Sequence, residues 1–149
     1  MAHFVKHTAL PFLITCLCTF VLASALHSLF VLTALAGIDI EIGFANAMQM
    51  IGSDLLGLLP TYGVIIAVTL ALAFTFARFV FLRQQKPARF TVLIYALAGM
   101  VGFLVMLSAM QPILNVTLIA GARSTAGLIA QCCAGLIGGI VFCALKQRL

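Results

Sequence analysis

The sequence predicts an all-α integral membrane protein, in which four membrane-spanning helices form a bundle and an additional amphipathic helix lies between the first and second spans. Of its 149 residues, 64% are hydrophobic and 7% are charged, and the mean hydropathy is +1.27. This composition leaves too little polar surface to cover a soluble globule. Four apolar runs reach the roughly 20 residues that cross a hydrocarbon core about 30 Å thick. We therefore expect a single membrane domain.

The first span is expected over residues 9–36. Residues 8–38 carry no charge, which is enough length for one tilted helix. A cleaved signal peptide is the competing interpretation, because Ala23-Ser24-Ala25 has the small-x-small form of a cleavage site. The apolar pattern continues well beyond this site, so cleavage would divide one continuous span.

An amphipathic helix is expected over residues 44–59. Apolar residues recur there at steps of three and four while polar residues share another face: Phe44, Met48, Ile51, Leu55 and Leu58 are the apolar set, and Asn46, Gln49 and Ser53 the polar set. Pro60 predicts a kink or a break before the next span. One continuous helix through both segments would be about 60 Å long, twice what a bilayer core needs. The amphipathic segment is therefore expected to lie on the membrane surface, or to dip into the membrane and pack on the bundle.

The other three spans are expected over residues 61–82, 90–110 and 124–145. Pro87, in a short basic connector, separates the second span from the third because proline interrupts a helix. Pro112 is expected to close the third span. Ser124 or Thr125 can cap the fourth span at its start.

The basic residues indicate how the bundle is oriented, because excess positive charge stays on the cytoplasmic side of a membrane. The N-terminal tail holds one basic residue, the connector after the second span holds four when Arg78 is included, and the C-terminal tail holds two. The opposite side of the predicted bundle holds only Arg123. We expect a protein of a bacterial inner membrane with both termini in the cytoplasm.

Arg123 stands at the non-cytoplasmic end of the fourth predicted span. A cation there needs water or a carboxylate, and Asp54, with Asp39 and Glu41 as alternates, is expected on the same side. We predict an Asp54–Arg123 ion pair that ties the fourth span to the start of the second. A pair that only stabilises the fold, an outer latch at a substrate or ion site, and an arginine that snorkels to water remain three open interpretations.

A possible intramembrane polar site comprises His27, Ser24, Ser28 and Gln131. An imidazole titrates near neutral pH, so at membrane depth it can relay protons or hold a ligand. A neutral histidine that is satisfied by a serine or a backbone carbonyl is the simpler alternative. Gln131 lies deep in the fourth predicted span and is expected to form an interhelical hydrogen bond worth about 1 kcal/mol.

The fourth span also carries small residues at helical spacing, namely Ala126, Ala130, Ala134 and Gly138, beside Gly135 and Gly139. Rows of small residues let helix backbones approach closely in lipid. We predict tight packing of this face against a helix of the same chain or of another copy.

Several classes of chemistry are disfavoured. All five cysteines fall inside apolar runs, where a thiol is inert and packs as a small hydrophobe, so a thiol oxidoreductase is not expected. His3 and His7 lack a third ligand nearby, and we predict neither a metal site nor a cofactor. The basic residues flank the spans, which is typical of topology signals rather than of nucleic-acid binding.

These observations favour a non-enzymatic membrane protein. The leading hypothesis is an oligomeric pathway for a small solute or ion, or a helix-packing subunit of a larger membrane complex; its expected partners are the bilayer and other copies of the chain or other membrane subunits. The alternative is a membrane-embedded enzyme or cofactor carrier that uses His27 with a lipid, quinone or haem ligand. The sparsity of titratable residues in the predicted spans disfavours proton-coupled pumping and general acid–base catalysis.

Overall fold

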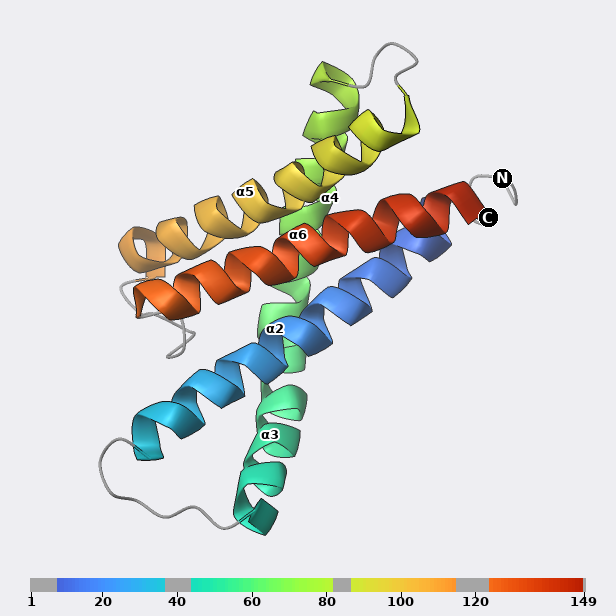
Figure 1. Ribbon diagram of the computed structural model, residues 1–149. Coiled ribbons are helices and arrows are strands. Elements are labelled where there is room, and N and C mark those ends of the chain that lie inside the picture. Colours follow the sequence, from blue (N-terminus) through green and yellow to red (C-terminus); the bar gives the residue numbers. More distant parts are fainter. Residues whose placement is uncertain (1–7, 37–43, 82–86, 115–123, 149) are drawn as a thin grey trace.

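A computed structural model describes residues 8–36, 44–81, 87–114 and 124–148 (Figure 1). All elements in these segments are helices. In chain order they are α2 (Leu10–Ala36), α3 (Phe44–Leu58), the π-helical turn η2 (Leu59–Gly63), α4 (Val64–Val80), α5 (Ala88–Leu114) and α6 (Thr125–Arg148).

Within these segments, four helices are long and apolar enough to cross a membrane. They cover Leu10–Thr33, Ile51–Val80, Ala88–Met110 and Thr125–Arg148. The all-helical fold class predicted from composition is therefore confirmed. Membrane insertion itself is inferred from the length and composition of these helices.

The second candidate span covers Ile51–Val80 and includes residues before 61, where the sequence predicts its start. Helix α3 occupies the predicted amphipathic segment. The helical run continues through Pro60, so this proline does not end it. The π-helical turn η2 joins α3 to α4, so the helical run from Phe44 to Val80 is about 55 Å long. A proline lacks the N–H that an α-helical turn needs, and a local π adjustment accommodates this loss. That α3 lies on the membrane surface stays a prediction.

Helix ends are set by local capping. The Gly127 N–H donates to Ser124 Oγ over 3.0 Å, so Ser124 is the residue that caps α6. The carbonyl of Pro87 accepts hydrogen bonds from the backbone N–H of Phe90 at 3.0 Å and of Thr91 at 3.1 Å, which starts α5. This helix continues to Leu114, past the expected end at Pro112, because the last turn of a helix loses only one backbone donor to a proline.

Helix α6 lies between α5 and α2, and the run formed by α3, η2 and α4 crosses behind these three helices (Figure 1). The α5–α6 interface is a contact between backbones. A Cβ atom added to Gly135 would lie 2.5 Å from the Gly99 carbonyl oxygen, and one added to Gly139 would lie 2.7 Å from Ala96 Cα. Real Cβ atoms do not come this close to other heavy atoms, so this interface requires glycine at both positions.

The opposite side of α6 is equally close to α2. A Cβ atom added to Gly138 would collide with Thr19 Oγ1 and would lie 3.3 Å from Thr19 Cγ2. The Cα of Gly138 therefore packs directly on the threonine hydroxyl, an arrangement that brings a Cα–H group against an oxygen. Helix α6 is thus fixed by glycines on both of its faces.

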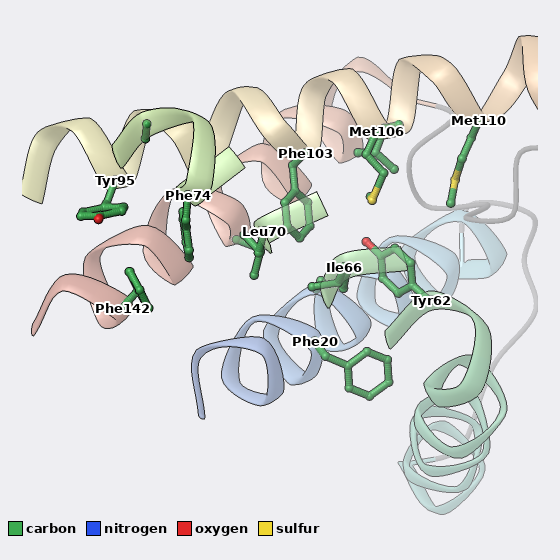
Figure 2. Close-up of a cluster of buried hydrophobic side chains, with 14 of the residues drawn as sticks. Phe20, Tyr62, Ile66, Leu70, Phe74, Tyr95, Phe103, Met106, Met110 and Phe142 are labelled. Carbon is green, nitrogen blue, oxygen red and sulfur yellow. The ribbon is translucent and has the colours of Figure 1, made fainter. Parts of the chain in front are cut away.

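An aromatic cluster of four rings closes one end of the core. It is defined by Phe12, Phe74, Tyr95 and Phe142, which come from α2, α4, α5 and α6 respectively. The rings of Phe74 and Phe142 stack at a centroid distance of 4.7 Å, and Tyr95 meets them edge-on at 5.5 and 5.1 Å. Figure 2 shows these three rings grouped at one end of the core, away from Met106 and Met110. The cluster joins the ends of all four long helices.

The glycine contacts make a direct prediction. Gly139→Ala should lower the free energy of unfolding by about 1–3 kcal/mol, because the new methyl group forces α5 and α6 apart. The matched control is Gly57→Ala in α3, where an added Cβ meets nothing within 4 Å. This control should leave stability unchanged or raise it by up to about 1 kcal/mol. Unfolding by dodecyl sulfate titration in dodecylmaltoside micelles measures both, and equal losses in the two variants would contradict the interpretation.

Candidate functional site

A stripe of polar side chains is buried between α2 and its neighbours. We call it the polar seam and define it by Thr15, Thr19, Ser24, His27 and Ser28 on α2 with Gln131 on α6, all of which are buried. On α2 these residues form two rows at four-residue steps: Thr15 and Thr19 lead through position 23 to His27, and Ser24 leads to Ser28. The exposed positions Leu13, Leu17, Val21 and Leu29 form a third row. Helix α2 is therefore amphipathic, with polar side chains toward the protein interior and apolar side chains on the side expected to face lipid.

Gln131 occupies the centre of the seam and uses both ends of its amide. The Tyr62 hydroxyl donates to Gln131 Oε1 over 3.1 Å, and Gln131 Nε2 donates to the Ala23 carbonyl oxygen over 2.9 Å. These two bonds, which we call the Gln131 clasp, join η2, α6 and α2. The clasp matches the interhelical hydrogen bond expected for Gln131, and its partners are now identified.

Tyr62 reaches Gln131 because of the π-helical turn. Pro60 lies in this turn, and Tyr62 is its buried residue. The Tyr62 ring also packs against the Phe20 ring at a centroid distance of 6.4 Å, and Figure 2 shows its hydroxyl end directed away from Phe20. The wider turn thus positions a tyrosine with its apolar ring on α2 and its hydroxyl on α6.

Three hydroxyl oxygens in the seam have no hydrogen-bond partner within the described part of the chain: Thr15 Oγ1, Thr19 Oγ1 and Ser24 Oγ. Each side chain is at most 1% exposed. A buried hydroxyl without a partner is unfavourable by about 1–3 kcal/mol, and valine would fill the space of either threonine without this penalty. Packing alone therefore does not explain these hydroxyls.

His27 and Ser28 lie one turn beyond Ser24 toward the end of α2. Both are buried, with 8% and 0% of the side chain exposed, and both interact with other residues. His27 continues the row of Thr15 and Thr19, and Ser28 continues the row of Ser24. The polar residues expected from the sequence therefore extend both buried rows of α2.

The predicted Asp54–Arg123 pair lies outside the described residues, because the structure describes neither Arg123 nor the side chain of Asp54.

The small residues predicted to form a packing row on the fourth span differ in burial. Ala134, Gly135, Gly138 and Gly139 are buried, Ala130 is half-buried and Ala126 is exposed. The buried members face α5 and α2 of the same chain, so this part of the row is occupied within one molecule.

Other candidate chemistry is limited in the described segments. Cys16, Cys18, Cys132, Cys133 and Cys143 are free thiols. No group of three or more histidine, cysteine or acidic side chains that could hold a metal ion occurs among the residues described. A groove of 1390 Å³ between α4 and α5 is lined almost entirely by apolar residues, so it offers contact surface rather than reactive groups.

Sequence reasoning missed Tyr62, Thr15 and Thr19. The two threonines were detectable, because four-residue steps back from His27 pass through position 23 to Thr19 and Thr15. Tyr62 gave no such signal. Its inward position depends on the π-helical turn, and the sequence around Pro60 is equally typical of a kink or a break.

No protein-family model, curated protein or solved structure matches this chain. Its class rests on its own composition and fold, which are those of a small polytopic membrane protein with four apolar helices in the described segments. Its function must be argued from the polar seam.

The Gln131 clasp predicts an energetic coupling. Gln131→Leu and Tyr62→Phe should each lower the free energy of unfolding by about 1 kcal/mol, since each leaves the other side chain without its partner. The double variant should lose less than the sum, with a coupling of about 0.5–1.5 kcal/mol. A double-mutant cycle in detergent micelles measures this quantity, and strictly additive losses would show that the two side chains do not interact.

Proposed function

We propose that this chain is a non-enzymatic membrane protein that provides a pathway for a small ion or polar solute along the polar seam. The observation that carries the proposal is the set of three buried hydroxyl oxygens without partners in the described structure, at Thr15, Thr19 and Ser24. Oxygen atoms of this kind can replace the water molecules that a permeating species leaves behind. In a lipid-exposed bundle, polar groups are retained on such pathways.

The length of the seam supports the proposal. From Thr15 to Ser28 the helix rises by about 20 Å, which is two-thirds of a hydrocarbon core about 30 Å thick. Thr15 and Thr19 lie about one helical turn apart, and Ser24 follows five residues later on the second row, so a permeating species would move partly around α2 between Thr19 and Ser24. His27 contributes a titratable group near the outer end of this row.

The seam is closed in this conformation, and we expect it to open at the contact between α2 and α6. Gly138 packs directly on Thr19 Oγ1, so a small separation of α2 from α6 would expose the Thr19 hydroxyl. Such a separation must also break the Gln131 clasp, since that amide binds the Ala23 carbonyl. Opening by relative movement of packed helices is a common form of conformational change.

The remaining parts of the proposal rest on the sequence. The Asp54–Arg123 pair would act as a latch at the outer end, the termini would lie in the cytoplasm of a bacterial cell, and several copies would assemble in its inner membrane. The seam lies inside one chain, so it does not need a second copy to be complete.

A helix-packing subunit is the second candidate, and the Gln131 clasp favours it. Both polar ends of Gln131 are used within the chain, as expected of a residue that only ties helices together. The mass of the purified particle separates the two candidates. A stoichiometric larger partner would support the subunit, and a particle made of this chain alone would support the pathway.

Flux measurements on isosteric variants test the proposal. Thr19→Val keeps the shape of the side chain and removes the hydroxyl, so it should lower flux about tenfold or more, since an oxygen worth more than about 1.4 kcal/mol is lost from the pathway. Its stability should be unchanged or higher. The control is Thr75→Val, because Thr75 is exposed on α4, and this variant should keep wild-type flux.

The assay uses purified protein in liposomes of phosphatidylcholine and phosphatidylglycerol, with a trapped pH-sensitive dye for protons and a potassium-sensitive dye for cations. Unchanged flux in Thr19→Val, with the protein folded, would contradict the pathway. A wild-type protein that passes neither ion nor small neutral solutes would also contradict it.

A further inference from the structure

Lys146 is held over aromatic rings at the end of the bundle where the aromatic cluster lies. Its ammonium nitrogen Nζ is 5.7 Å from the centroid of the Tyr95 ring and 5.8 Å from that of the Phe142 ring. The side chain is half-buried. Contacts of this kind restrict the position of the cation, so the ammonium group of Lys146 is held in one place over the rings.

A second cation lies at the same end of the core. Arg78, in the last turn of α4, is close enough to Lys146 and Tyr95 for its charge to act on both. Phe74, one turn before Arg78, stacks on Phe142, one turn before Lys146. The ring stack therefore draws the ends of α4 and α6 together and holds two like charges near each other.

No aspartate or glutamate lies near this pair in the sequence. All three acidic residues precede η2, and Asp54 lies about 36 Å from Arg78 along the helical run of α3, η2 and α4. Asp39 and Glu41 come between α2 and α3, at the opposite end of α2 from Phe12, which contacts Phe142. Two cations near the same end of the core, with no aspartate or glutamate close to them in the sequence, can bind an external anion.

The surroundings of Arg78 indicate which anion. The neighbouring side chains of Phe76, Phe79 and Phe81 are 63%, 72% and 54% exposed, and apolar exposure of this extent is expected against lipid. Arg78 and Lys146 lie at the ends of their spans, which is the level of the lipid headgroups. Phosphate groups of lipids are therefore the anions that this position meets.

We propose that Arg78 and Lys146 together bind the phosphate of an anionic phospholipid, with the guanidinium group of Arg78 donating paired hydrogen bonds and the ammonium group of Lys146 supplying the second charge. The bound lipid neutralises the repulsion between the two cations and links α4 to α6. This site shares no residue with the polar seam, so either proposal can fail without the other.

The test uses the full-length protein in dodecylmaltoside with added dioleoylphosphatidylglycerol or dioleoylphosphatidylcholine. Native mass spectrometry counts bound lipid, and thermal unfolding reports stabilisation. Phosphatidylglycerol should bind and raise the unfolding temperature more than phosphatidylcholine does. Arg78→Gln and Lys146→Gln should each weaken phosphatidylglycerol binding about fivefold. Arg148→Gln is the control, because Arg148 is exposed at the end of the same helix, and it should bind as the wild type does.

The proposal would be overturned by equal binding of the two lipids, unchanged binding in the Arg78 and Lys146 variants, an equal loss in Arg148→Gln, or full stabilisation by inorganic phosphate alone. Full stabilisation by inorganic phosphate would identify a free phosphate as the ligand. Lys146→Arg guards against misfolding of the neutral variants, because it keeps the charge and should retain at least half of the wild-type affinity; a loss as large as that of Lys146→Gln would contradict a charge-based site.

Discussion

The close approach of α6 to both of its neighbours is the constraint on which the rest of the structure depends. Lipid provides no hydrophobic force between helices, so association relies on backbone contact and interhelical hydrogen bonds. Gly135 and Gly139 supply this contact toward α5, and Gly138 supplies it toward α2. Because α6 is glycine-lined on both sides, the three helices form a closely packed layer, and the run of α3, η2 and α4 crosses behind it (Figure 1).

This close approach has consequences at two places in the fold. At the centre, it places Gln131 within reach of the Ala23 carbonyl and of Tyr62, and it covers the Thr19 hydroxyl with Gly138. At the end of the bundle, it brings Phe142 into the aromatic cluster and Lys146 beside Arg78. The same packing thus creates a closed polar interior and an open cationic site, which suit a permeating species and a lipid phosphate respectively.

Composition and helical spacing were sufficient to predict the all-helical class and the four apolar runs, and they singled out His27, Ser24, Ser28 and Gln131 without showing which way these side chains face. They were insufficient for features that depend on exact geometry. Pro60 is compatible with a break, a kink or a π-helical turn, and only the last of these brings Tyr62 to Gln131. The aromatic cluster joins residues from four helices, and no local sequence pattern predicts a contact between residues so far apart in the chain. The Asp54–Arg123 pair remains a prediction because it lies outside the described residues.

Access of water to the polar seam tests the central claim most directly. Ser24→Cys places a thiol at a buried seam position with little change in size, and Leu17→Cys places one on the lipid face of the same helix, where Leu17 is 59% exposed. A charged methanethiosulfonate reagent reacts with thiols that water reaches, and the five native cysteines give the background in the wild type. The pathway predicts labelling of Ser24→Cys well above this background and none of Leu17→Cys. Failure of Ser24→Cys to label from either side of the membrane would contradict a seam that opens.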